Sequence, residues 1–282
     1  MKQALRVILL ALTALFAVNV VPASAQYFNK PSNIWLKSMP GMEAKDRKTA
    51  ESEADSVNGT KLTRVTNPTL EAFMPVEGTS NGHAVIVCPG GAYHQLAYQK
   101  EGQEIAQWLA KQGYNAYVLA YRVPDNREGA LQDLQRAIRV LRHLGAKDVG
   151  VIGFSAGASL ACRAATNWKE PAYMVKDKAI DTLSCRPDFA MLIYPAYLNE
   201  GEGGTHSPDL QVESDTPPMF VIGIQDDTRF SGPSCKTILK AMQEANAPIE
   251  LHYLNKAGHG YGMRRGAGLI WPALAEHWLK EK

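Results

Sequence analysis

The sequence lacks any long apolar run beyond its first 25 residues, and it has no block of like charges. Lys and Arg number 30, and Asp and Glu number 28, among 282 residues. Without Lys2 and Arg6, which precede the N-terminal apolar run, the two counts are equal. Nucleic acids and anionic membranes bind proteins through concentrated positive charge. We therefore expect neither as a partner of the mature protein.

Cysteine is scarce as well. The four cysteines lie far apart, without the short spacings of a metal site, and they are Cys88, Cys162, Cys185 and Cys235. We therefore expect no metal site. Cys88 and Cys162 lie in apolar stretches, where buried free thiols are common. If a disulfide forms, Cys185 with Cys235 is the expected pair.

The N-terminus has the pattern of an export signal. Lys2 and Arg6 precede an apolar run over residues 7–21, and the run is followed by an Ala-Ser-Ala site that ends at Ala25. The run has about fifteen residues, whereas a membrane-spanning helix needs roughly 20. A signal peptide cleaved after Ala25 is therefore favoured over a membrane anchor. The mature protein is then expected to be secreted or periplasmic.

The chain after residue 25 divides into a lead-in and one domain. Residues 26–58 are polar with little periodicity, which predicts an extended or partly disordered segment. From residue 59 to 282 short apolar strands alternate with helical patterns, beginning with HAVIVC at 83–88 and an amphipathic segment at 101–113. Later strands are expected at 116–121, 149–154, 189–194, 219–224 and 249–254. This alternation predicts an α/β domain with a mostly parallel sheet covered by helices on both faces, and ligands at the carboxyl ends of the strands.

The motif GFSAG at 153–157 follows one of these strands and precedes a helix-forming run. This is the context of a nucleophile elbow, a sharp turn that lifts a serine above the sheet of an α/β-hydrolase fold. Side chains at positions 153 and 157 would collide with the neighbouring helix and strand, so both positions need glycine. Ser155 is therefore the predicted nucleophile, placed at a helix N-terminus that favours negative charge.

A serine nucleophile needs a base that is oriented by an acid, and in this fold the chain order is Ser, acid, His. His259 lies in the glycine-flanked loop KAGHGYG and is the predicted base. Asp226 and Asp227 both follow the strand MFVIGI, and either could orient the imidazole. The other histidines after Ser155 lie in an insertion, a strand and the last helix, and they are His206, His252 and His277.

An oxyanion hole is predicted in the loop PGGAY at 89–93, which follows the strand AVIVC. Its paired glycines let backbone amides approach a ligand closely. The predicted donors are the amides of Gly91 and Ala92, together with that of Ala156 after the nucleophile. Tyr93 and His94 continue this loop and are the candidate substrate-binding residues.

Several motifs together carry a family resemblance. In chain order they are CPGGAYHQLAYQKEGQEIAQWLAKQGYNAYVLAYRV, LQDLQRAIRVLR, GFSAGA, PPMFVIGIQDD and AGHGYG. The set resembles secreted α/β-hydrolase esterases of the acetylxylan-esterase-like or BD-FAE type. In such relatives the acid lies seven residues after the phenylalanine that follows the PP pair, which from Phe220 is Asp227. The loop from Thr228 to Ser231 departs from the relatives' pattern, so Asp226 stays as the alternative acid.

The resemblance implies a serine esterase that removes acetyl groups from carbohydrate such as acetylated xylan, without a metal or another cofactor. The substrate is then a small-molecule or polysaccharide ester. The polar segment 198–216 is expected to form a cap over the site, and a polar cap suits a sugar better than a long acyl chain. Three alternatives remain open: a general carboxylesterase or lipase, a prolyl-oligopeptidase-like serine peptidase, and a non-catalytic secreted sugar-binding protein.

Overall fold

The computed structural model describes residues 28–282, apart from 29, 37, 56–58 and 256–257. The expected export signal therefore lies outside the described residues. Within the described part of the chain, no helix is both long enough and apolar enough to cross a membrane.

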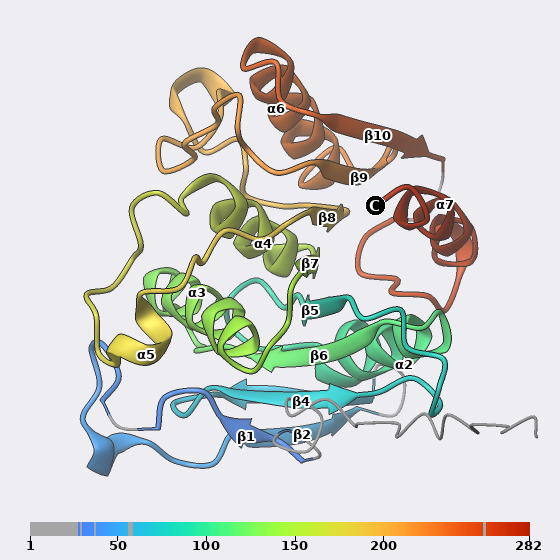
Figure 1. Cartoon of the computed structure of the whole chain (residues 1–282). Coiled ribbons are helices and arrows are strands. Elements are labelled where there is room, and N and C mark those ends of the chain that lie inside the picture. Colours follow the sequence, from blue (N-terminus) through green and yellow to red (C-terminus); the bar gives the residue numbers. More distant parts are fainter. Residues whose placement is uncertain (1–27, 29, 37, 56–58, 256–257) are drawn as a thin grey trace, which may run out of the picture.

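An eight-stranded sheet forms the centre of the molecule (Figure 1). Six neighbouring strands run parallel to one another, and two further strands add an antiparallel edge on one side. The mostly parallel sheet that the sequence predicts is therefore present. In spatial order the strands are β1 (Ser32–Asn33), β4 (Thr69–Phe73), β6 (Asn115–Ala120), β5 (Ala84–Cys88), β7 (Val149–Phe154), β8 (Ala190–Ile193), β9 (Met219–Ile224) and β10 (Ile249–Leu254).

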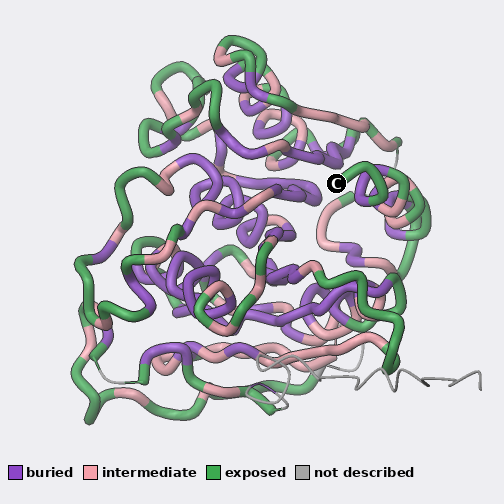
Figure 2. The backbone as a smooth tube through the Cα atoms, viewed as in Figure 1, coloured by how far each residue is buried: buried purple, intermediate pink, exposed green. Residues whose placement is uncertain are grey.

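The position of a strand in the sheet follows from its sequence. The central strands β5, β7 and β9 are buried at every residue and read as continuous apolar runs, because helices cover both of their faces. Edge strand β10, with the sequence IELHYL, is half-buried along most of its length. Figure 2 shows this gradient from the buried centre of the sheet to its edges.

Helices cover both faces of the sheet (Figure 1). On one face α2 and α7 pack together, and the rings of Trp108 and Trp271 meet edge to face at 5.2 Å. On the other face α3 packs against α4, while α6 packs against β9 and β10. The helices are α2 (Glu104–Lys111), α3 (Arg127–His143), α4 (Ala156–Thr166), α5 (Lys178–Asp181), α6 (Ser231–Glu244) and α7 (Trp271–Leu279). Shorter helical segments are η1 (Ala44–Asp46), η2 (Tyr98–Gln103), η3 (Glu202–Gly204) and η4 (Gly266–Leu269).

The N-terminal region holds strands that the sequence pattern did not reveal. The segment predicted as a lead-in contains, in its described part, β1, η1 and β2 (Glu51–Asp55), and β2 pairs with β3 (Gly59–Arg64) in a separate antiparallel hairpin. The hairpin is joined to the loop after β5 by two backbone hydrogen bonds, from Leu62 N–H to Leu96 O at 3.0 Å and from Leu96 N–H to Leu62 O at 2.8 Å. The N-terminal hairpin therefore braces the loop that carries the predicted oxyanion donors.

A buried ion pair ties this N-terminal region to the sheet. The side chains of Arg122 and Asp133 are 3% and 0% exposed, and Arg122 Nη2 lies 2.9 Å from Asp133 Oδ1. Asp133 also accepts a hydrogen bond from Trp35 Nε1 at 2.8 Å. Arg122 Nη1 donates to the Pro40 carbonyl at 2.7 Å. The pair thus links the end of β6 and helix α3 to Trp35 and Pro40.

Replacing Asp133 should therefore weaken the whole fold. We expect Asp133→Ala to lower the free energy of unfolding by about 3–5 kcal/mol, because it leaves a buried guanidinium without its counter-charge. Urea denaturation followed by circular dichroism measures the change. Glu51→Ala is the matched control, since Glu51 and Arg64 form a pair that is 63% and 64% exposed, and such pairs contribute little. Equal losses in the two variants would contradict this account.

The four cysteines are free and buried. Cys185 Sγ donates to the Trp168 carbonyl at 3.4 Å, and Cys235 Sγ lies 3.7 Å from Ser231 Oγ. The disulfide considered for Cys185 and Cys235 is therefore absent. Burial raises the pKa of Cys235 to about 12, so the thiol stays protonated at neutral pH.

Candidate active site

Ser155 lies at the sharp turn between β7 and α4. Its backbone has φ 51° and ψ −114°, a conformation that residues other than glycine rarely adopt. The turn leads directly from the last residue of the strand, Phe154, to the first residue of the helix, Ala156. The serine hydroxyl is therefore held at the carboxyl end of the sheet and at a helix N-terminus.

The two glycines around Ser155 are required by close packing. A Cβ on Gly153 would lie 2.1 Å from the carbonyl oxygen of Gly157, and a Cβ on Gly157 would lie 2.1 Å from the carbonyl oxygen of Cys88. Both contacts are with backbone atoms, which cannot move aside as a flexible side chain can. The spacing of the GFSAG motif thus follows from the approach of α4 to β7 and to the end of β5.

Ser155, His259 and Asp227 form one hydrogen-bonded chain. The Ser155 Oγ lies 2.6 Å from His259 Nε2, and His259 Nδ1 lies 2.6 Å from Asp227 Oδ2. With the imidazole proton on Nδ1, the carboxylate accepts that proton's hydrogen bond and Nε2 accepts one from the serine hydroxyl. Ser155 follows β7, His259 follows β10 and Asp227 follows β9. The three parallel strands therefore bring these residues together at their carboxyl ends.

The two neighbouring aspartates have different environments. Asp227 is 7% exposed, and its carboxylate accepts hydrogen bonds from the backbone N–H groups of Phe230 and Ser231, each at 3.1 Å. Asp226 is exposed, and its Oδ1 accepts a hydrogen bond from Gly258 N–H at 3.4 Å. Asp227 therefore faces the imidazole, while Asp226 contacts the backbone of the loop that carries His259.

The predicted oxyanion donors lie beside Ser155. Gly91 and Ala92 line the same pocket as the serine, and Ala156 follows it at the start of α4. Gly91 and Ala92 have φ values of 136° and 58°, so the backbone of this loop is neither helical nor extended at these two residues. Among the described residues, none accepts a hydrogen bond from the N–H of Gly91, Ala92 or Ala156. These amides are therefore available to a ligand oxygen.

The pocket around Ser155 has a volume of about 390 Å³. His94 lines it at the rim, where its Nδ1 lies 2.8 Å from Asp125 Oδ1. Tyr93 does not line it, because its ring is turned into the core and is 2% exposed. The remaining wall is formed by aromatic rings and polar side chains, which include Lys61, Gln95, Lys100, Tyr197 and Phe230.

The expected cap is not observed. No residue of the segment 198–216, all of which is described, lines the Ser155 pocket. Two ion pairs hold the segment elsewhere, from Arg127 Nη1 to Glu200 Oε2 at 2.6 Å and from Arg163 Nε to Asp209 Oδ2 at 2.5 Å. The prediction of a cap was therefore wrong, because arginines on α3 and α4 draw this polar segment to the side of the molecule.

Glu101, for which the sequence alone indicated no role, is only 3% exposed. Its Oε2 accepts a hydrogen bond from Gly90 N–H at 2.9 Å, and its Oε1 accepts one from the Tyr194 hydroxyl at 2.8 Å. That hydroxyl in turn accepts a hydrogen bond from Gly262 N–H at 3.0 Å. Burial, together with the Glu101 charge, raises the pKa of Tyr194 well above its ordinary value, so the phenol remains a donor. One carboxylate thus connects the oxyanion loop to the histidine loop.

The signal in the sequence was the Glu-Gly pair at 101–102, which is among the features of the family resemblance, although it indicates no role for the carboxylate. The structure has a π-helical segment there, η2, before the α-helix begins. Such segments are rare and are frequent at functional sites. Lys100, also in η2, donates from Nζ to the Gly260 carbonyl at 2.8 Å. This segment therefore holds the histidine loop through two neighbouring side chains. Among the described residues there is no group of three or more side chains suited to hold a metal ion.

Comparison with known proteins agrees with this geometry. Residues 70–189 match the family model described as BD-FAE, and the matched part includes Ser155 and the loop that carries the predicted oxyanion donors. An acetylxylan esterase of Xylanibacter ruminicola is 28% identical, over 68% of this chain and 43% of the relative. An endo-1,4-beta-xylanase B of Butyrivibrio fibrisolvens is 26% identical, over 68% of this chain and 34% of the relative. The chain thus spans less than half the length of these curated relatives. The family resemblance predicted from the sequence is confirmed.

Solved structures show the same fold. An acetyl ester-xyloside bifunctional hydrolase of Caldicellulosiruptor lactoaceticus has a TM-score of 0.71 at 26% identity, and the match covers 90% of this chain and 96% of that one. A butyrate-bound esterase of Thermogutta terrifontis has a TM-score of 0.65 at 21% identity, over 82% and 94% of the two chains. The protein therefore has the α/β-hydrolase fold that its sequence predicts.

Proposed function

We propose that the protein is a serine carboxylic ester hydrolase that removes acetyl groups from carbohydrate such as acetylated xylan. The observation that carries the proposal is the hydrogen-bonded chain from Ser155 through His259 to Asp227, beside unpaired backbone amides. The names of its relatives, an acetylxylan esterase and an acetyl ester-xyloside hydrolase, support the substrate class.

In the first half of the reaction, His259 Nε2 takes the hydroxyl proton of Ser155 as Oγ attacks the ester carbonyl. The carbonyl oxygen becomes an oxyanion, and the N–H groups of Gly91, Ala92 and Ala156 donate hydrogen bonds to it. His259 then protonates the departing sugar oxygen, which leaves an acetyl-serine.

In the second half, His259 takes a proton from water as the water attacks the acetyl-serine. The same amides stabilise the second oxyanion, and the proton returns to Ser155 as acetate leaves. Asp227 holds the imidazole with its proton on Nδ1 and stabilises the imidazolium that forms in each half. Every step is an acyl or proton transfer.

The pocket supports a short acyl group and a polar leaving group. Its volume of about 390 Å³ is at the small end of ligand sites. Polar side chains of His94, Gln95 and Lys100 contribute to its wall, where hydroxyl groups of a sugar would find hydrogen-bond partners. A long acyl chain would instead need a broad apolar groove.

The acyl-chain preference tests the proposal. We expect kcat/KM for p-nitrophenyl acetate to exceed that for the octanoate ester by about tenfold or more, because the additional methylenes find no apolar groove to bury them. Acetate release from acetylated xylan, measured beside a panel of other acetylated polysaccharides, tests the carbohydrate. Faster cleavage of octanoate would assign the protein to the lipases or general carboxylesterases.

We also propose that the protein is exported and loses residues 1–25. The charged start and the apolar run with its small-residue end support this. N-terminal sequencing of the protein recovered outside the cytoplasm should begin at Gln26. An uncleaved N-terminus on the exported protein would refute the cleavage site.

Glu101 provides a further test of the site. We expect Glu101→Gln to lower kcat by about 100-fold with little change in KM, because an amide cannot accept from both Gly90 and Tyr194 and the loops that they hold shift relative to Ser155. Steady-state kinetics with p-nitrophenyl acetate separate the two constants.

Glu104→Gln is the matched control for this variant. Glu104 lies three residues further along and pairs with Arg264 at the surface, away from the Ser155 pocket. It should keep both kinetic constants near their wild-type values. A Glu101→Gln variant with unchanged kcat would show that its carboxylate does not position the site.

A further inference from the structure

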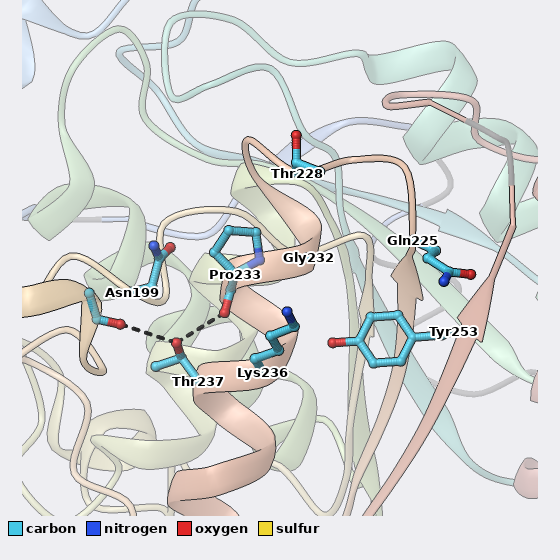
Figure 3. A pocket seen from close by; sticks show the side chains of 9 residues that line it. Asn199, Gln225, Thr228, Gly232, Pro233, Lys236, Thr237 and Tyr253 are labelled. Carbon is cyan, nitrogen blue, oxygen red and sulfur yellow. Dashed lines mark hydrogen bonds between the residues drawn. The ribbon is translucent and has the colours of Figure 1, made fainter.

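A second pocket lies on the other side of the loop that carries Asp227. It has a volume of about 630 Å³ and is bordered by β9, β10, α6 and the loop after β8 (Figure 3). Thr228 lines this pocket, whereas Phe230 lines the pocket of Ser155. The segment 228–230 therefore forms the wall between the two. We call this second site the Tyr253 pocket, after the aromatic residue in its lining.

Tyr253 presents a ring in a fixed position. It lies on edge strand β10 opposite Gly223 of β9, and a Cβ on Gly223 would be 2.6 Å from the ring carbon Cε1. The Tyr253 ring thus packs over the backbone of β9 at Gly223, which has no side chain. It is nevertheless 41% exposed, and it is the one aromatic ring among the exposed large hydrophobic side chains of the described residues. An exposed ring held in this way is ready to stack on a ligand.

Polar groups lie around this ring. Within the described residues, Lys236 Nζ has no ion-pair or hydrogen-bond partner, and in Figure 3 its side chain lies across from the Tyr253 hydroxyl. Asn199 Oδ1 accepts a hydrogen bond from Ser234 Oγ at 3.3 Å, so its NH₂ group is the part left for a ligand. Burial raises the pKa of Tyr253 to about 12, which keeps the phenol a donor at neutral pH. The pocket lining contains no carboxylate.

We propose that the Tyr253 pocket binds a sugar unit of the polysaccharide chain whose acetyl group is cleaved at Ser155. A sugar ring has an apolar face of C–H groups and a rim of hydroxyls. The Tyr253 ring matches the face, and the donors of Lys236 and Asn199 match the rim. The identity of the chain rests on the proposed function, whereas sugar binding itself does not.

The position of the pocket adds a role in substrate selection. Because the segment 228–230 separates the two pockets, a chain that lies across this loop occupies both at once. Binding of the second unit then raises the affinity for polymeric substrate through effective concentration, without changing the chemistry at Ser155. Small esters, which fill one pocket only, gain nothing from it.

Binding of unacetylated sugar tests the proposal directly. Isothermal titration with xylohexaose should show that Tyr253→Ala weakens binding by about tenfold, the loss of one central aromatic contact. Tyr253→Phe, which keeps the ring on Gly223, should retain most of the affinity and also reports on folding. Leu269→Ala removes another exposed large apolar side chain, one that does not line the Tyr253 pocket, and should change nothing. Equal affinity of Tyr253→Ala and the wild type would overturn the proposal.

Kinetics separate this proposal from the proposed function. Turnover of p-nitrophenyl acetate should be the same in Tyr253→Ala and the wild type, while KM for acetylated xylan rises. If the protein cleaves no ester but loses xylohexaose binding in Tyr253→Ala, the sugar site stands and the esterase proposal fails. If it cleaves esters and both proteins bind xylohexaose equally, the esterase proposal stands and the sugar site fails. Self-association through β10 that Tyr253→Ala abolishes, without any sugar binding, would identify the surface as a contact between copies and overturn the proposal.

Discussion

Ser155→Ala should lower kcat for p-nitrophenyl acetate by about 10⁶-fold, to the level set by the remaining oxyanion donors and substrate binding. The variant removes the atom that attacks the ester carbonyl of the substrate in the proposed mechanism, and His259 then has no serine hydroxyl to deprotonate. The release of p-nitrophenol, followed over long incubations for the slow variant, measures the loss of kcat. Because alanine is smaller than serine and the hydroxyl bonds only to His259, the fold should remain intact.

The control for this variant is a serine that lies outside the site. Ser184 is exposed, and its hydroxyl accepts a hydrogen bond only from the nearby Arg186 N–H, so Ser184→Ala should keep full activity. Both variants should unfold at the wild-type temperature. Undiminished turnover in a folded Ser155→Ala protein would mean that another nucleophile acts and that the proposed mechanism is wrong.

Asp227→Asn should lower kcat by about 10⁴-fold, whereas Asp226→Asn should cost only a small factor. The asparagine amide would present N–H to His259 Nδ1 and drive the imidazole proton to Nε2. That nitrogen could then no longer accept the proton of Ser155. Both variants replace a carboxylate with an amide, and they do so at adjacent positions. Each variant is therefore the control for the other.

The same two variants can also contradict the assignment of Asp227 as the acid. If Asp226→Asn proved to be the inactive variant, the hydrogen bond of 2.6 Å between Asp227 and His259 would not be the one that serves the reaction. The alternative acid that the sequence left open would then be assigned. Kinetics at several pH values would show whether the defect lies in proton transfer.

The elbow was predictable because its causes are local. A strand, two glycines and a helix-forming run are neighbours in the sequence, so their spacing alone indicated the turn at Ser155. The choice between Asp226 and Asp227 was not local in this sense. It depends on the N–H groups of Phe230 and Ser231, which fix one carboxylate toward the imidazole. The residues themselves do not indicate the direction in which each side chain points, so only the spacing from Phe220 in the family resemblance favoured Asp227.

Two other features were hidden for different physical reasons. The segment 198–216 has the composition of a surface loop, and nothing in it indicates that ion pairs with Arg127 and Arg163 draw it away from the site. Glu101 lies in an amphipathic pattern, where a carboxylate is ordinarily solvated. Only the tertiary structure shows that it is buried against Gly90 and Tyr194.

The bridge between Leu62 and Leu96 depends on backbone conformation and not on side-chain identity. Both of its hydrogen bonds join main-chain atoms, so almost any pair of residues with a strand conformation can make them. A brace of this kind leaves the identity of its residues free to drift while its geometry persists. Substitutions at position 62 or 96 that keep the strand conformation should therefore leave the support of this loop intact.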